Sequence, residues 1–232
     1  MRVVLITMVS LFCATAAFAQ ESPKITPKWK SLFNGKDLSG WTIVGGGATY
    51  RVEDGDIVGT RGPGPNTFLR TDKAYGDFVL ELEFKWDEPI NSGVQFRSRQ
   101  RDRDGRVTGY QCELDHSDRH WTGGIYDEAG RGWLAPLGDM TGDEIVDVND
   151  LLAMAAVPDI HQWSTLRIEA VGDRLQTWVN GIPCADLVDS QDAEGFIALQ
   201  VHGSKDPGQV RWRNIRLMTA RNGSSAGSLK QN

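Results

Sequence analysis

The chain has 232 residues, and its 31 acidic against 25 basic side chains give a formal net charge of −6. An acidic chain without a basic stripe is a poor ligand for polyanions, which argues against binding to nucleic acid. Its 3 cysteines are too few for the disulfide framework of a small secreted scaffold. The length suffices for one domain with its own hydrophobic core.

The start of the chain is typical of a secretory signal peptide covering residues 1–19. Arg2 precedes an apolar run at residues 3–17, and a small-x-small cleavage site ends at Ala19. Because the apolar run is short for a membrane span, we expect cleavage near Ala19 and an exported protein, periplasmic or extracellular, with no membrane span in its mature form. The alternative is an uncleaved membrane anchor. Residues 20–28 then form a polar linker.

Beyond the linker, apolar and polar residues alternate in many short segments, with the period of a half-buried strand. The clearest is FVLELEFKW at residues 78–86, where every second residue is apolar. Asp54-Gly55 and Asn180-Gly181 indicate tight hairpin turns. Further strands are predicted to begin at Trp41 and to cover residues 49–53, 56–59, 68–71, 94–97, 110–115, 164–170, 174–180, 182–188, 196–202 and 210–217.

Helix patterns are scarce and limited to a segment of about two turns at residues 148–155. Many short strands with glycine-rich turns predict an all-β fold, a β-sandwich or jelly roll of two antiparallel sheets with very little helix. The connections are too short for the crossover helices of a parallel sheet. We expect this single domain to span residues 29–218. A tail rich in Ser, Gly and Asn follows at residues 219–232 and is predicted to be disordered.

The predicted strand at residues 110–115 carries its polar side chains on one face. Because side chains alternate along a strand, Gln111, Glu113 and Asp115 point away from the core. The same parity directs polar side chains outward on the strand before it and on a later one: Gln95, Arg97, Gln200 and His202. Polar and aromatic residues also follow the strand: His116, Trp121, Tyr126 and Arg131. We predict one concave cleft lined by this set, which suits sugars and other polar small molecules; the alternative is an outer sheet face of salt bridges.

Several segments of the chain carry a resemblance to a known family. In chain order they are FNGKDLSGW, LELEFKW, NSGVQFRS, GYQCELD, GGIYDEAGRGWL, WSTLRIEAVGDRLQTWVNG and GFIALQVHG. In order and spacing they resemble the 3-keto-disaccharide hydrolase family, long called a domain of unknown function, from about Trp29 to Met218. The resemblance implies a concanavalin-like jelly roll. It also implies exported proteins that act on glycosides oxidised at C3 of a sugar ring.

The chemistry that the resemblance implies needs three kinds of side chain. A ketone at C3 makes the C2 proton acidic, so a base can form an enediolate, the C1 substituent can leave, and water can add back. Such a site needs a base, a group that stabilises the oxyanion, and an acid for the leaving group. By side-chain type the base is Glu113, Asp115 or a histidine, the oxyanion is held by Arg97 or a bound cation, and the acid is His202 or Tyr126. The expected partner is a carbohydrate, with binding residues Gln95, Gln111, His116, Trp121, Tyr126, Arg131 and Gln200.

Two other carbohydrate functions fit the same residues. The sequence ELD at residues 113–115 is similar to the acidic strand of laminarinase-type glycosidases. However, Ser117 stands where those enzymes carry a further acid, so the retaining pair is incomplete. A non-catalytic carbohydrate-binding module would instead use Trp121, Tyr126 and Trp133 as stacking platforms, without an ordered acid and base.

Two segments contain side chains of the types that bind divalent cations. His116 and His120 stand four residues apart, but that spacing brings side chains together on a helix, and this segment is predicted to be a loop. In DMTGDEIVDVND, the count of an EF-hand loop assigns calcium ligands to Asp139, Thr141, Asp143, Asp147 and Asp150. Because Thr141 is a weak ligand and Glu144 stands where the turn wants glycine, we favour an acidic surface loop over a calcium site.

Overall fold

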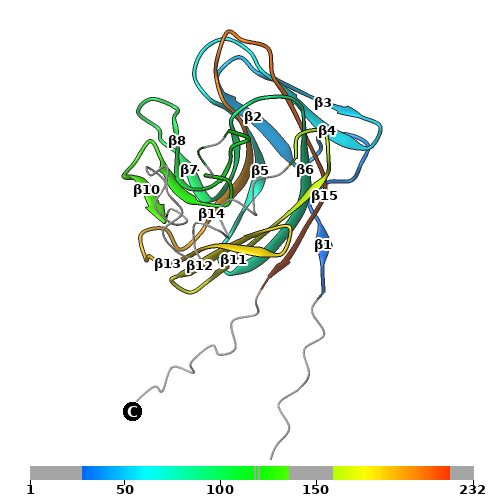
Figure 1. Ribbon diagram of the computed structural model, residues 1–232. Helices are drawn as coiled ribbons and strands as arrows, with labels where there is room; N and C mark the ends of the chain where they lie inside the picture. Colours follow the sequence, from blue (N-terminus) through cyan, green and yellow to red (C-terminus); the bar gives the residue numbers. More distant parts are fainter. Residues whose placement is uncertain (1–27, 118, 120, 136–158, 220–232) are drawn as a thin grey trace, which may run out of the picture.

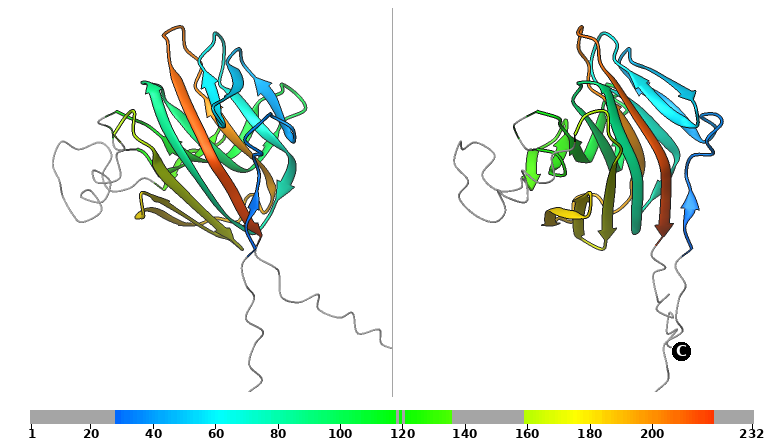
Figure 2. Two further views of the ribbon diagram at one scale, coloured as in Figure 1. Left: turned by 90° about the vertical axis from the view of Figure 1, so that its right-hand side faces the viewer. Right: turned by 45° about the vertical axis from the view of Figure 1, so that its right-hand side comes forward.

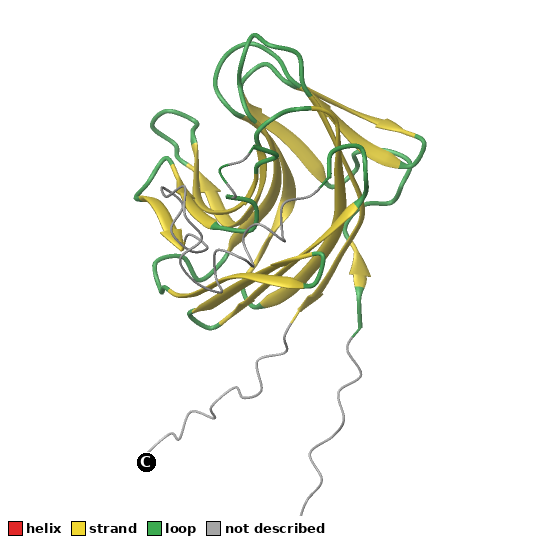
Figure 3. Cartoon of the chain, in the orientation of Figure 1, coloured by secondary structure: helices red, strands yellow, loops and turns green. Residues whose placement is uncertain are grey.

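The computed structural model describes residues 28–117, 119, 121–135 and 159–219. These residues form strands, turns and loops, with no helix among them (Figure 3). Accordingly, none of the described ranges contains a helix that could cross a membrane. Several expectations concern residues outside this part of the chain: the signal peptide, the helix at 148–155, the calcium loop at 139–150, His120 and the tail after Thr219.

The strands form two antiparallel sheets (Figure 1). The eight-stranded sheet has the order β13 (Ile182–Val188), β12 (Arg174–Val179), β11 (Ser164–Val171), β6 (Phe78–Glu88), β15 (Gln209–Thr219), β4 (Asp56–Thr60) and β3 (Thr49–Glu53), with β1 (Lys30–Ser31) paired to β15. The seven-stranded sheet has the order β10 (Gly132–Ala135), β9 (Ile125–Glu128), β8 (Val107–Leu114), β7 (Ser92–Gln100), β14 (Gly195–Val201), β5 (Thr67–Tyr75) and β2 (Trp41–Gly45). The eight-stranded sheet curves around the seven-stranded one (Figure 1).

The core lies between the two sheets and is built from the apolar half of each alternating strand. From the eight-stranded sheet it takes Phe78, Leu80, Leu82, Phe84 and Trp86 of β6. From the seven-stranded sheet it takes Val94, Phe96, Tyr110, Cys112, Leu114, Ile197, Leu199 and Val201. Because both sheets contribute one apolar face to a shared core, the predicted β-sandwich of antiparallel sheets is confirmed.

The outer faces of the two sheets differ in burial. Strands β6 and β11 alternate for most of their length between buried residues and half-buried or exposed ones, as expected where one face meets solvent. In β8 every residue is buried, and in β7 only the last two are exposed. The outer faces of β7 and β8 are therefore largely buried, although they carry the polar side chains of Gln95, Gln111 and Glu113.

The first and last strands of the described chain meet at one end of the sandwich. Lys30 of β1 faces Leu217 of β15, and Ser31 faces Arg216, in an antiparallel pair. Figure 2 shows the short first strand beside the end of the long last strand. The two ends of the domain therefore lie close together.

Candidate functional site

A cleft of about 560 Å³ lies on the outer face of the seven-stranded sheet. It brings together six of the residues selected from strand parity and from the segment after β8: Gln111, Glu113, Trp121, Tyr126, Gln200 and His202. Trp133, considered as a stacking platform of a binding module, lines it too. Further lining residues that the sequence did not point to are Asn66, Asn91, Arg106, Arg119, Glu128 and Ala129.

Glu113 lies at the floor of this cleft with its carboxylate almost fully buried. Gln111 donates a hydrogen bond from Nε2 to Oε2 of Glu113 at 2.7 Å, and Asn91 donates from Nδ2 to the other carboxylate oxygen, Oε1. Burial raises the pKa of Glu113 to about 7, although the two amide hydrogen bonds favour its charged form. A carboxyl group with a pKa near neutrality is suited to transferring a proton.

Gln111 is itself held by a chain of buried polar side chains behind the cleft. Ser98 donates from Oγ to Oε1 of Gln95 at 2.8 Å, and Gln95 donates from Nε2 to Oε1 of Gln111 at 2.7 Å. Because each acceptor oxygen is fixed by the donor behind it, the Nε2 of Gln111 is the atom that faces Glu113. Gln95 therefore orients the site from beneath and does not line the cleft, which corrects its predicted role in substrate binding.

A glycine in the strand next to β8 leaves room for this network of side chains. Glu113 of β8 faces Gly93 of β7, and Gly93 faces Gln200 of β14. A Cβ atom at Gly93 would lie 2.5 Å from Cδ of Gln111, so the missing side chain makes space for the Gln111 amide. Gln200 is buried at this face, and its Oε1 has no hydrogen-bond partner among the described residues. That oxygen is a free acceptor for a substrate hydroxyl.

Aromatic rings form one wall of the cleft. The ring centroids of Trp121 and Trp133 lie 4.7 Å apart, and those of Tyr126 and Trp133 lie 5.2 Å apart. The indole Nε1 of Trp121 is buried without a hydrogen-bond acceptor in the described part of the chain, so it can donate to a ligand. Arg119 lies over the ring of Trp121, with its guanidinium carbon 3.8 Å from the ring centroid. The wall thus combines apolar area with two donors.

Three further titratable groups face the cleft. Burial raises the pKa of Tyr126, so its phenol keeps its proton, and the negative charge of Glu113 contributes to this shift. Burial also raises the pKa of Glu128, which accepts a hydrogen bond from Nδ2 of Asn66 at 3.3 Å. The pKa of His202 is lowered by burial and by the positive charges of Arg61 and Arg119, so its imidazole is neutral at neutral pH.

A smaller hollow of about 440 Å³ continues the cleft along the sheet. It shares Asn66, Arg106 and Glu128 with the cleft, and Phe68 and Val107 form an apolar part of its lining. The two spaces therefore adjoin, and Glu113 lines only the cleft.

Arg97 does not face the cleft, and the expectation that it does is wrong. The pairing of β7 with β8 shifts register between Phe96 and Arg99, and Arg97 has φ 46°, so the alternation of faces breaks at this bulge. Its buried guanidinium donates to the backbone oxygens of Gly76 at 3.0 Å and Gly172 at 2.8 Å, and pairs with Asp77 at 3.0 Å. Arg97 therefore connects the two sheets and is not placed to hold a substrate oxyanion.

Three other predicted residues also point elsewhere. Asp115 is buried behind the cleft and pairs with Arg119 at 2.5 Å, so it positions a lining residue but does not line the cleft itself. His116 packs its ring against Trp86 of the core, with centroids 6.0 Å apart, because it lies beyond the end of β8, where the alternation stops. Arg131 forms ion pairs at 2.6 Å with both Asp127 and Asp189, away from the cleft. Strand parity does not extend into such loops.

Comparison with known proteins connects the chain to a carbohydrate-related family. A model of the 3-keto-alpha-glucoside-1,2-lyase-like domain matches residues 28–218. No curated protein sequence matches the chain.

Solved structures share the sandwich. A protein from Parabacteroides distasonis ATCC 8503, proposed to be a glycosyl hydrolase, aligns with a TM-score of 0.58 at 21% identity, covering 83% of this chain and 94% of that one. The carbohydrate-binding module CBM66 from Bacillus subtilis aligns with a TM-score of 0.54 at 20% identity, covering 78% and 96%. A Bacillus subtilis protein with a galectin-like fold aligns with a TM-score of 0.58 at 11% identity, covering 83% and 98%. At these identities the likeness shows a common fold.

Proposed function

Because the chain belongs to the family of 3-keto-alpha-glucoside-1,2-lyase-like domains, we propose that it cleaves glycosides that carry a ketone at C3, by elimination followed by hydration. The single observation that carries this proposal is Glu113, a buried carboxyl group in a cleft whose pKa is raised to about 7. The signal-peptide pattern at the start of the sequence supports an exported enzyme.

Glu113 is the base in this proposal. Its two carboxylate oxygens already accept hydrogen bonds from Asn91 and Gln111, which fix the orientation of the group. A base must be ionised to act but must bind its proton strongly enough to remove one from carbon, and a pKa near the working pH serves both needs. The C2 proton beside a C3 ketone is acidic enough for such a base.

Tyr126 is the proton donor to the leaving group. The raised pKa keeps its phenol protonated, whereas the lowered pKa of His202 leaves a neutral imidazole that accepts more readily than it donates. Tyr126 faces Gln111 across the β8–β9 pair, and it lines the same cleft as Glu113, which supports this role. Arg119, which lines the same cleft, takes the role expected of Arg97, because its positive charge can stabilise the enediolate oxygen.

The proposed reaction balances in two stages. Glu113 takes the C2 proton, and the electron pair of that bond forms the enediolate over C2 and C3. When the C1–O bond breaks, its electrons leave with the aglycone oxygen, which takes a proton from Tyr126, and a C1–C2 double bond forms. Water then adds to C1 and gives its second proton to the Tyr126 phenolate, while Glu113 returns a proton to C2, so both residues regain their starting forms and the free 3-keto sugar is released. The hollow beside the cleft offers space for the aglycone.

The test compares a 3-keto-glucoside with its unoxidised parent under the same conditions. Turnover of the keto compound alone supports the proposal, and exchange of the C2 proton with deuterium from solvent would identify the first step. Turnover of the parent glucoside would instead indicate an ordinary glycosidase.

A non-catalytic carbohydrate-binding module is the second candidate. The aromatic wall of Trp121, Tyr126 and Trp133 favours it, because aromatic faces present a large rigid area to the apolar side of a sugar ring. Binding of sugars with neither turnover of either compound nor exchange of the C2 proton would support this candidate over the enzyme.

A further inference from the structure

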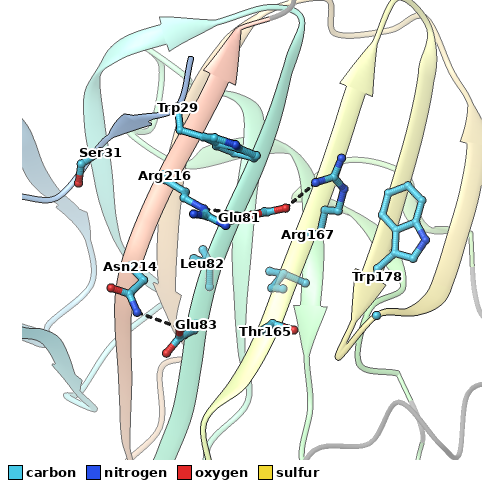
Figure 4. Close-up of a pocket in the computed structure, with 12 residues that line it drawn as sticks. Trp29, Ser31, Glu81, Leu82, Glu83, Thr165, Arg167, Trp178, Asn214 and Arg216 are labelled. Carbon is cyan, nitrogen blue, oxygen red and sulfur yellow. Dashed lines mark hydrogen bonds and ion pairs between the residues drawn. The ribbon is translucent and has the colours of Figure 1, made fainter. Parts of the chain in front are cut away.

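The outer face of the eight-stranded sheet carries a groove of about 900 Å³, separate from the cleft (Figure 4). The core lies between the sheets, so this groove and the cleft lie on opposite sides of the sandwich. Trp29, just before β1, lies at one end of the groove, and Trp178 of β12 lies at the other. Both indoles are half-buried, so each keeps part of its surface open to solvent.

Between the two tryptophans the side chains form one continuous row. Arg216 of β15 faces Glu81 of β6, Glu81 faces Arg167 of β11, and Arg167 faces Trp178. Trp29 closes the other end of the row, because the Arg216 guanidinium carbon lies 4.8 Å from its ring centroid. The row crosses four adjacent strands, so it runs perpendicular to them for about 14 Å, the length of about three pyranose rings.

The charged groups of this row neutralise one another. Glu81 pairs with Arg216 at 2.6 Å and with Arg167 at 2.5 Å, and Arg167 also pairs with Glu169. Glu83, which also lines the groove, pairs with Arg213 at 2.6 Å. Three arginines therefore face three carboxylates, which leaves no net charge to attract a polyanion or a polycation. The partly exposed N–H groups and carboxylate oxygens still offer donors and acceptors along the groove.

From this arrangement we propose that the groove binds a neutral polysaccharide chain laid across the strands, with sugar rings against Trp29 and Trp178. The apolar C–H face of a pyranose suits the electron-rich face of an indole. Sugar hydroxyls are both donors and acceptors, so they can bond to the paired arginines and glutamates without a need for net charge. The proposal goes beyond the function of the cleft and does not depend on turnover there.

The test is migration of the full-length protein in native gels that contain barley β-glucan, dextran or xyloglucan, with heparin as the charged comparison. We expect at least one neutral polysaccharide to retard the protein and heparin to leave it unaffected. Trp178→Ala should weaken the apparent affinity roughly tenfold or more, as truncation of a tryptophan that anchors a contact typically does. Trp178→Phe, which keeps an aromatic face, should restore part of the retardation.

Two control variants show whether retardation depends on this groove. Arg174 lies on the same strand and face as Trp178 but outside the groove, so Arg174→Ala should be retarded as strongly as the wild type. Trp121→Ala alters the cleft and should also leave retardation unchanged. The proposal is overturned if no neutral polysaccharide retards the wild type. It is also overturned if Trp121→Ala abolishes retardation while Trp178→Ala does not. A third contradicting result would be that the wild type sediments as a dimer and that the only effect of Trp178→Ala is to dissociate this dimer.

Discussion

Nε2 of Gln111 lies 2.7 Å from Oε2 of Glu113, and this contact joins the cleft to the buried amides behind it. The contact stabilises the ionised form of a carboxylate that burial makes hard to ionise. The balance between these two effects sets the pKa of Glu113, so the neighbours of this one side chain can be used to adjust it.

Replacing Glu113 with Gln should reduce turnover of a 3-keto-glucoside by about 10²–10⁴-fold, because the variant loses its proton-transfer group while keeping nearly the same shape. The measurement is kcat for the wild type and the variant with equal folded fractions. Unchanged activity would remove Glu113 from the mechanism.

The same variant should change how stability depends on pH. The pKa of Glu113 is about 7 in the folded protein against a usual 4.5, so the folded state binds this proton more tightly than the unfolded state. The wild type therefore loses stability as pH rises from about 4.5 to about 7, while the neutral amide does not titrate. The measurement is the unfolding free energy of both proteins, by denaturation at pH 5 and at pH 8. Between these two pH values the wild type should lose stability relative to Glu113→Gln.

The pH dependence of kcat/KM should also show the ionisation of Glu113. Because the base acts when deprotonated, kcat/KM should rise with pH through a midpoint near 7. Asn91→Ala removes a hydrogen bond to the charged carboxylate, so the midpoint should move upward by about one pH unit. A midpoint that stays in place, or moves downward, would contradict the assignment of this limb to Glu113.

Tyr126→Phe should act through the leaving group. Without the phenolic proton, expulsion of an alcohol of high pKa should slow by about 10²-fold or more. A nitrophenol leaving group needs no proton, so its release should be nearly unaffected. Equal losses with both kinds of leaving group would show that Tyr126 has another role.

Gly93→Ala tests whether the amide network orients the base. A methyl group at this position would lie within 2.7 Å of three Gln111 side-chain atoms, so the Gln111 amide must move. A displacement of about 1 Å near a reacting group can cost about 10²-fold in rate, and we expect kcat to fall on that scale. Gly76→Ala is a suitable control, since its nearest contact would be 3.4 Å. Equal activities of the two variants would argue against the network.

Arg97→Met should affect stability alone. The variant leaves Asp77 and three backbone oxygens without their buried donor, which should lower the free energy of unfolding by about 3 kcal/mol. The exposed Arg103, whose contact with Asp104 is 3.7 Å, serves as the control, and Arg103→Met should change stability by less than about 0.5 kcal/mol. Urea denaturation of both variants, followed by an assay of the folded fraction, separates this role from one in the cleft.

Much of the fold is predictable because most strands repeat one simple pattern. The strands predicted at residues 49–53 and 182–188 match β3 and β13. Strands β9 and β10 escape prediction, because glycines flank both of them in the sequence GGIYDEAGRGWLA and their pairing is interrupted by a bulge near Ala135. Such a glycine-rich segment reads as a loop, whatever the alternation of its few apolar residues.

The site is partly predictable for the same reason. Glu113 and Gln200 follow from parity, and Glu128 could have been found, since it has the same parity as Tyr126 in the sequence IYDE. Asn66 and Asn91 come from loops, and which loops border the cleft depends on pairings between strands far apart in the chain. The parity of Arg97 predicts the wrong face of the sheet, because a one-residue bulge interrupts the alternation of side chains in β7. The sequence pattern does not reveal this bulge.

The pairing of β1 with β15 has a practical consequence for engineering. Facing Cα atoms in an antiparallel pair are about 5 Å apart, so a few glycine and serine residues would join the chain ends beside Lys30 and Leu217 without strain. New ends could be opened in the hairpin between β7 and β8, where Asp102 and Arg103 are exposed. The domain is thus suited to circular permutation. It is also suited to insertion into a loop of a host protein, because its two ends are close enough to be attached to the two sides of an opened loop.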